Sequence, residues 1–314
     1  MDDRPQLRPR ATELSARLGL NVHRERWPTA PALKAYEAAG LSWVQVHTPP
    51  RAMLADRELC RRHARALRAV LDTCGLRLVL HAPDDLSAGT IEHDRAFDGL
   101  LEYASLAGAE LIAYHGLNFV DADGPAAARI RERAQLEERS LQRFSQRAHT
   151  LGITIAVENL APVHPSPPTQ GRLCHDPRAV RDLVRRIDSP ALGMLLDLGH
   201  LHVTADASRT DAAMALAAVA SDVVLFHVHD NLGARRHDVG APGIDPLRLD
   251  LHLPPGQGSL PWRRLAGVLC DHPAPLVLEV EPSHRPELAA LVTVTSHLLL
   301  DGRQRAERRA AAAA

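Results

Sequence analysis

The sequence predicts an α/β protein folded as a single (β/α)8 barrel, on the basis of three observations. Short apolar runs of strand length alternate with helix-like runs almost to the end of the chain. Eight such pairs fit into 314 residues, the size of one barrel domain. No G-x-G-x-x-G motif follows the first apolar run, which disfavours the alternative, a doubly wound open sheet.

The expected strands are apolar through most of their length, as parallel strands buried on both faces are. They cover residues 18–23, 43–48, 76–82, 110–116, 153–159, 192–198, 223–229 and 275–281. Helices are expected between them over residues 55–75, 126–152, 175–187, 208–220, 259–270 and 285–300. An earlier outer helix contains Lys34, the only lysine of the chain, so a Schiff-base aldolase is disfavoured.

The barrel domain is expected to span residues 17–302. Residues 1–16 are interpreted as a flexible leader and residues 303–314 as a C-terminal tail. The N-terminal residues do not resemble a signal peptide, and no run reaches the roughly 20 apolar residues of a membrane span. The four cysteines form no C-x-x-C pair, which argues against a zinc knuckle and fits a reducing cytosol. We therefore expect a cytoplasmic protein without a membrane partner.

Nine metal-type side chains form a pattern: seven close or follow apolar runs, and two stand in LDLHLPPGQG, a loop close to a glycine turn. They are His81, His115, Glu158, Asp197, His200, His227, Asp250, His252 and Glu279. Strand ends meet at one face of a barrel, the face where active sites are built. An apolar barrel interior does not tolerate unpaired carboxylates, and no strand-end arginine accompanies these. The pattern predicts a site for a divalent metal such as zinc, manganese, iron or cobalt.

Spacing alone leaves two of these assignments open. His227 and His229 are two residues apart, so both side chains face the same way along a strand. The same holds for Glu279 and Glu281.

Two long segments leave the ends of expected strands, residues 160–177 and 231–250. Long loops in a compact domain are usually functional. The second segment contains Arg235, Arg236 and Arg248, and at least one of them is expected to bind a phosphate or carboxylate of a substrate. The alternative is that all three are solvated.

Five motifs carry a resemblance to a known family. They are Glu-Asn after the fifth expected strand, Asp-x-x-His after the sixth, HVHD, Asp-x-His followed by PPGQG, and PLVLE. Together they resemble the xylose-isomerase-like TIM barrels, which include endonuclease IV and the sugar-phosphate isomerases and epimerases. The resemblance covers roughly residues 18 to 300.

The resemblance implies ligand sets. In endonuclease IV a pattern of this kind holds three zinc ions. By that likeness the sets are His81, His115 and Glu158 for the first ion, Glu158, Asp197, His227 and Glu279 for the second, and His200, Asp250 and His252 for the third. Epimerase relatives use mainly the second set, for one ion, with the two glutamates as acid and base and the histidine of Asp-x-x-His on the substrate. The resemblance favours His227 over His229 and Glu279 over Glu281.

Two kinds of chemistry fit these residues. In a sugar isomerase or epimerase, the ion polarises a carbonyl while Glu158 and Glu279 move a proton on the neighbouring carbon. In an endonuclease IV-like trinuclear zinc phosphodiesterase, the metals assist hydrolysis at an abasic DNA site. A third class is a barrel that binds a metal or polyol without turnover, which the intact ligand set disfavours.

The surrounding residues decide the ranking. The full set of nine ligands supports the nuclease, and Arg51 stands where the endonuclease pattern has a DNA-contacting arginine. Against it, Asp84 and Asp85 replace the bulky wedge of the endonuclease and repel phosphate. Aromatic residues are only 3% of the chain, so stacking platforms for bases are scarce. We therefore expect first an isomerase for a sugar or sugar phosphate with one to three ions per chain. Nucleic acid is disfavoured, and the oligomeric state is left open.

Overall fold

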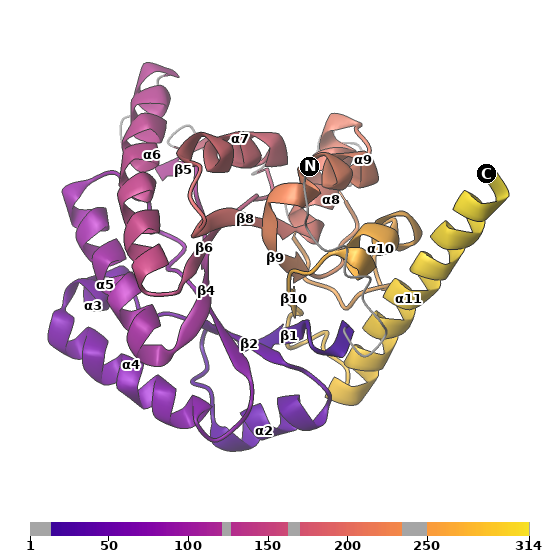
Figure 1. The fold of residues 1–314 in the computed structure, drawn as a ribbon, viewed down its shortest axis with the longest axis horizontal. Helices are drawn as coiled ribbons and strands as arrows, with labels where there is room; N and C mark the ends of the chain where they lie inside the picture. The colour runs from indigo at the N-terminus through magenta and orange to yellow at the C-terminus, as the bar shows by residue number, and fades with distance from the viewer. Residues whose placement is uncertain (1–13, 121–126, 163–169, 234–249, 314) are drawn as a thin grey trace, which may run out of the picture.

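A computed structural model describes residues 14–120, 127–162, 170–233 and 250–313. Eight parallel strands close into a barrel, and helices form a ring outside them (Figure 1). The strands are β1 (Leu18–Asn21), β2 (Trp43–His47), β3 (Arg77–His81), β4 (Ala109–Tyr114), β6 (Thr154–Glu158), β8 (Leu192–Asp197), β9 (Val223–Val228) and β10 (Leu276–Leu278). β10 pairs with β1 and closes the sheet, which confirms the predicted (β/α)8 barrel.

The outer layer contains more elements than the sequence analysis expected. The longer helices are α2 (Ala30–Ala38), α4 (Arg57–Leu71), α5 (Ile91–Ala107), α6 (Ala127–Thr150), α7 (Pro177–Ile187), α8 (Leu198–Ser208), α9 (Ala212–Val219), α10 (Trp262–Asp271) and α11 (Leu288–Ala313). The short helix α3 covers Arg51–Ala55. Helices α5 and α8 were not anticipated, and α11 continues through the residues interpreted as a tail.

A small antiparallel ribbon lies outside the barrel sheet. It pairs β5 (Asn118–Val120) with β7 (Gln170–Arg172). β7 lies in the segment interpreted as a long loop, and β5 was not predicted, because three-residue strands carry too little periodicity to be recognised. β5 follows β4 and β7 follows β6 along the chain. The ribbon therefore brings Asn118 and Arg172 to the cavity at the barrel mouth.

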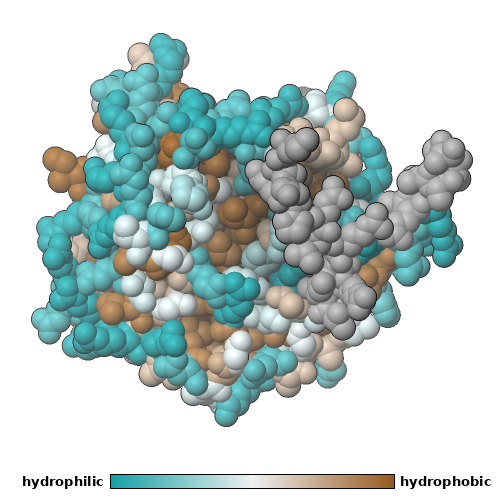
Figure 2. Space-filling model, in the orientation of Figure 1, coloured by the Kyte–Doolittle hydropathy of each residue, from teal (hydrophilic) through white to brown (hydrophobic). Residues whose placement is uncertain are grey.

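Packing separates the inside of the barrel from the layer between strands and helices. A cluster of apolar side chains fills the interior: Trp43, Val79, Leu111, Ala113, Ala156, Leu195, Leu225 and Val277. A much larger cluster packs the other strand faces against the helices. Figure 2 shows hydrophilic residues over the outer helices and hydrophobic residues gathered toward the barrel axis. This arrangement follows from the period of two along each strand.

Arg17 joins the start of the barrel to the end of helix α10. Its guanidinium donates to the carbonyl oxygens of Leu269, Cys270 and Ala274, at distances of 2.8, 3.1 and 2.9 Å. Leu269 and Cys270 lie in the last turn of α10, whose carbonyls lack partners within the helix. These hydrogen bonds stabilise the closure of the barrel where β1 pairs with β10.

None of the helices in the described part of the chain combines the length and the apolar character that crossing a bilayer requires.

Candidate metal centre

All nine predicted residues lie at one mouth of the barrel, and the strand pattern explains why. On each of five strands the residue two positions after an interior apolar residue is a site residue, so both point into the barrel. These pairs are Val79 and His81, Ala113 and His115, Ala156 and Glu158, Leu195 and Asp197, and Leu225 and His227. Val277 and Glu279 continue the rule at β10. The floor of the barrel is therefore apolar and its mouth ionic.

Four buried side chains, the core group, converge on one imidazole nitrogen. His227 Nδ1 lies 3.1 Å from Glu158 Oε1, 3.3 Å from Glu279 Oε2 and 3.8 Å from Asp197 Oδ2. Each member is at most 7% exposed. One imidazole cannot neutralise three buried carboxylates, and unpaired buried charge is costly. The core group therefore has the donor set and the charge to hold a divalent cation.

Gln45, which the sequence analysis did not select, determines which nitrogen of His227 faces the core group. Its side-chain amide donates to Glu279 Oε1, so its carbonyl oxygen must face the other way. That oxygen lies 2.8 Å from His227 Nε2 and accepts its proton. Neutral His227 therefore carries no proton on Nδ1, and the lone pair of Nδ1 points at the three carboxylates.

Three further histidines of the mouth are oriented by backbone carbonyls. His81 Nδ1 donates to Ala82 O (2.8 Å), and His200 Nδ1 donates to Asn159 O (2.9 Å). His252 Nδ1 donates to Glu279 O at 2.7 Å. In each ring Nε2 is left for the site. Such outer bonds fix the tautomer and orientation of metal-binding imidazoles.

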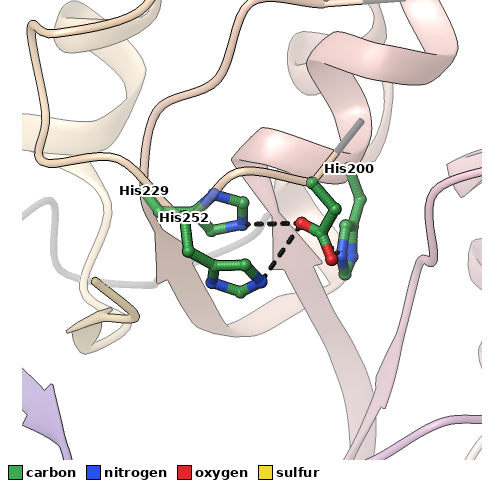
Figure 3. Close-up of side chains that lie close together, drawn as sticks. His200, His229 and His252 are labelled. Carbon is green, nitrogen blue, oxygen red and sulfur yellow. Dashed lines mark ion pairs between the residues drawn. The ribbon is translucent and has the colours of Figure 1, made fainter. Parts of the chain in front are cut away.

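A second cluster, the rim group, contains His200, His229, Asp250 and His252. Figure 3 shows its three imidazoles turned toward one carboxylate. Asp250 Oδ1 lies 3.1 Å from His252 Nε2, 3.3 Å from His200 Nε2 and 3.8 Å from His229 Nε2. Asp250 and His252 both have positive φ, 33° and 48°, which non-glycine residues rarely adopt. Strain of this kind is typical of ligand sites.

His229 also lies in the site, although the family resemblance favoured His227 over it as a ligand. It is fully buried, and its Nε2 lies 3.1 Å from both carboxylate oxygens of Asp197. His227 contacts the core group as predicted, so His229 joins the core and rim groups rather than replacing His227. A side chain at Gly199 would lie about 2.0 Å from this ring, so the glycine leaves room for it. The HVH spacing contained the signal, since it places both rings on one face.

Asp197 also serves the backbone. It is the N-cap of α8, and its Oδ1 accepts from the His200 N–H at 2.7 Å. The Asp-x-x-His motif thus forms the start of helix α8, directly after β8. The cap fixes the height of His200 above the core group.

A third cluster, the flank group, contains His81, Asp84 and His115. The contacts of its two histidines with Glu158 indicate that the site fits a cation. Glu158 Oε2 is buried and makes no hydrogen bond, although His115 Nε2 lies 3.2 Å away and His81 Nε2 lies 3.8 Å away. These atoms face one another without the geometry of a hydrogen bond. A metal ion among them would satisfy all three, which matches the first predicted ligand set.

The ionisation of the site follows from its crowding. Burial lowers the pKa of His227, but the carboxylates of Glu279 and Glu158 outweigh burial and raise it to about 9. For His252 the carboxylate of Asp250 likewise outweighs burial, and the pKa rises to about 10. Without a metal, these histidines hold protons as counter-ions. His47, which stacks on His81, has its pKa lowered to about 2, first by burial and then by that neighbour.

The groups enclose a cavity of about 510 Å³. Arg235, Arg236 and Arg248, predicted to reach it, lie outside the described residues. Two other arginines line it, Arg24 and Arg172.

The two acidic residues taken as an obstacle to phosphate are ion-paired. Arg24 lies 3.0 Å from Asp84, and Arg51 lies 3.2 Å from Asp85. Because these arginines offset the two carboxylates, Asp84 and Asp85 repel a DNA phosphate less than the sequence suggested.

Two buried carboxylates support the mouth from behind. Asp230, next to His229, accepts from Gly256 N (2.9 Å), Leu260 N (3.1 Å) and Trp262 Nε1 (2.7 Å), which ties the segment after the rim group to β9. Glu137 of α6 accepts from Tyr114 Oη (2.5 Å) and Leu117 N (3.0 Å), on both sides of His115. Burial raises the pKa of Glu137 to about 7.

With this geometry established, the sequence can be compared with known families. The sequence model of the xylose isomerase-like TIM barrel matches residues 33–297. The chain belongs to this family. No curated protein matches it in sequence.

Solved structures of the family share the fold at low identity. A D-tagatose 3-epimerase-like protein superposes with a TM-score of 0.69 at 16% identity, covering 92% of this chain and 99% of its own. 3-Keto-D-glucoside 4-epimerase from E. coli gives 0.62 at 14% identity, covering 88% and 99%. D-psicose 3-epimerase from Clostridium cellulolyticum gives 0.62 at 12% identity, covering 92% and 98%.

Proposed function

We propose that this xylose isomerase-like barrel is a divalent-metal-dependent sugar isomerase or epimerase that moves a proton on the carbon next to a carbonyl. The observation that carries the proposal is the core group, in which Glu158 and Glu279 lie 3.1 and 3.3 Å from His227 Nδ1. The sugar epimerases among the structural neighbours support the substrate class.

Residues Glu158, Asp197, His227 and Glu279 would hold the cation. When bound, a divalent ion supplies Lewis-acid polarisation of a carbonyl and an adjacent hydroxyl. The metal could be zinc, manganese, iron or cobalt, since imidazole and carboxylate ligands accept each of them.

The chain itself supplies the proton transfer. With one ion held by the core group and none beside His81 and His115, Glu158 Oε2 has no partner, so it is the oxygen that would take a proton from carbon. Gln45 donates to Glu279 Oε1 and holds this carboxylate in place. Glu279 can then return a proton to the substrate carbon. His200 Nε2 faces the cavity beside Asp250, where it can bind a substrate hydroxyl.

Proton exchange from solvent tests this function. A panel of ketoses and inososes in D₂O should show deuterium incorporation beside the carbonyl, dependent on added metal and lost in Glu158→Gln and Glu279→Gln. Glu281→Gln is the matched control, because Glu281 lines the same cavity outside the core group. Exchange that survives both core substitutions would exclude the proposed roles.

A second candidate function is metal-assisted phosphodiester hydrolysis, and a specific observation favours it. The core, rim and flank groups together give three adjacent ligand clusters, more than one-metal epimerisation needs. A duplex oligonucleotide with one abasic site is the test substrate. Metal-dependent cleavage without exchange on any sugar would reverse the ranking. If neither reaction occurs although the metal binds, the protein is a binding barrel.

A further inference from the structure

Arg172 lines the cavity, yet the proposed proton transfer does not use it. It ends β7, in the ribbon beside the mouth. Its Nε donates to Asn118 Oδ1 (3.4 Å), and its Nη1 donates to the carbonyl oxygen of Ala161. These bonds hold the planar guanidinium in one orientation. They leave Nη2 with donors for a further acceptor.

The charge of Arg172 lacks a counter-ion among the described residues. The other cavity arginine, Arg24, is 65% exposed and paired with Asp84 at 3.0 Å. Arg172 forms no such pair with a described carboxylate. Burial lowers its pKa, opposed by Cys174 and by the more distant Asp250 and Glu158. Arg172 is half-buried, so its guanidinium is only partly hydrated, and a bound anion would stabilise it.

The nearby acids do not remove this need. Asp250 belongs to the rim group and Glu158 to the core group, and a cation held by either group would neutralise its carboxylates. Of the two arginines among the described residues that line the cavity, Arg172 would then be the one without a carboxylate partner.

We propose that Arg172 binds an anionic group of the substrate, a carboxylate or a phosphate. The inference rests on the proposed function in taking a sugar as substrate, and it narrows that substrate to an acidic sugar or a sugar phosphate. Glu158 and Arg172 line one cavity of about 510 Å³, a volume typical of small-molecule sites. The reacting carbons then lie against the core group while the charged end lies on the guanidinium, whose fork matches such anions.

Three sugars that differ only at carbon 6 test the site: D-fructose, D-fructose 6-phosphate and D-fructuronate. Dissociation constants for the metal-loaded protein, measured by calorimetry, need no turnover. We expect at least one charged ketose to bind about tenfold or more tightly than D-fructose, as a charge-assisted bond predicts. The phosphate and carboxylate arms tell the two anions apart.

Substitutions assign the preference to one residue. Arg172→Gln should abolish the preference for the charged ketose, while Arg172→Lys should retain part of it and control for folding. Arg24→Gln, a matched change at the paired arginine, should leave the preference intact. Equal affinities in the wild type, or a preference that survives in Arg172→Gln, overturn the proposal. Charge preference without proton exchange on any sugar would instead remove the isomerase function and keep the anion site.

Discussion

The core and rim groups use the same ligand types but are built differently. Core side chains lie at the ends of barrel strands, and the most exposed of these residues, Glu279, is 7% exposed. In the rim group the side chain of Asp250 is 40% exposed, and two members have positive φ. Such backbone strain costs of order 1–3 kcal/mol per residue. Strand register and the buried hydrogen bonds of Gln45 hold the core group, whereas the rim group depends on a strained segment, so the rim geometry is easier to disturb.

The largest expected difference between the groups is in catalysis. Glu158→Gln should lower the rate of proton exchange by about 10²- to 10⁴-fold, the range for losing a general base, and it also removes a metal ligand. Asp250→Asn should lower it by no more than about tenfold. Steady-state rates at saturating metal measure both. Equal losses would mean that both groups act in one reaction, as the hydrolase function requires.

The second largest difference between the core and rim groups is expected in how tightly each group holds its metal ion. Stepwise addition of a chelator should remove rim ions before the core ion, because the rim ligands are more exposed and less rigidly held. His252→Asn should reduce the number of tightly bound ions only if the rim group is loaded in the wild type. Elemental analysis of protein purified without chelator measures this. Loss of the core ion first would contradict the ranking of rigidity.

Gln45 offers a change confined to the core group. Gln45→Leu removes the acceptor for His227 Nε2–H and the donor to Glu279, so affinity for the core ion should fall by about 10- to 100-fold. Rim affinity serves as the internal control. A core affinity equal to that of the wild type would show that Gln45 does not set the His227 tautomer.

The smallest effect is on stability of the metal-free protein. The pKa of His227 is raised to about 9 by Glu279 and Glu158 against burial, so its protonation stabilises the fold fully below about pH 6.5, the unfolded value. This contribution is lost as pH rises toward 9. The pKa of Glu158 is lowered by His227 and His115 against burial, so its contribution is lost in acid. Melting temperature should therefore be highest near pH 5–6.5 and fall toward pH 9.

Metal-loaded protein is the comparison for that measurement. A bound cation takes the place of the protons, so the decline above pH 6.5 should disappear. A decline of equal size with and without metal would locate the titrating groups elsewhere.

The sequence predicted the barrel, and it predicted that the nine candidate residues gather at one mouth, because both depend largely on a short-range pattern. An apolar run followed by His, Asp or Glu determines the strand, its inward face and its chemistry together. His227 and His229 show the limit of that pattern, since the period of two places both rings at the mouth and cannot divide their contacts between two groups.

The sequence did not predict the roles of Gln45 and Arg172, because those roles depend on contacts between distant parts of the chain. Gln45 lies inside β2 and resembles any polar strand residue, and its role depends on partners 182 and 234 residues away. Arg172 acquires its position from the β5–β7 pairing, which brings together segments more than 50 residues apart. Helix α8 was hidden because its N-cap, Asp197, was interpreted only as a ligand.

The bond between Trp262 and Asp230 gives the protein an optical property. The chain has three tryptophans. Trp27 is 41% exposed and Trp43 lies in the barrel floor, whereas Trp262 is buried and donates its indole N–H to the carboxylate next to His229. Indole emission responds to the charge and hydrogen bonding around the ring. The protein therefore carries its own chromophore beside the rim group, and its fluorescence can follow what that group binds without any attached label.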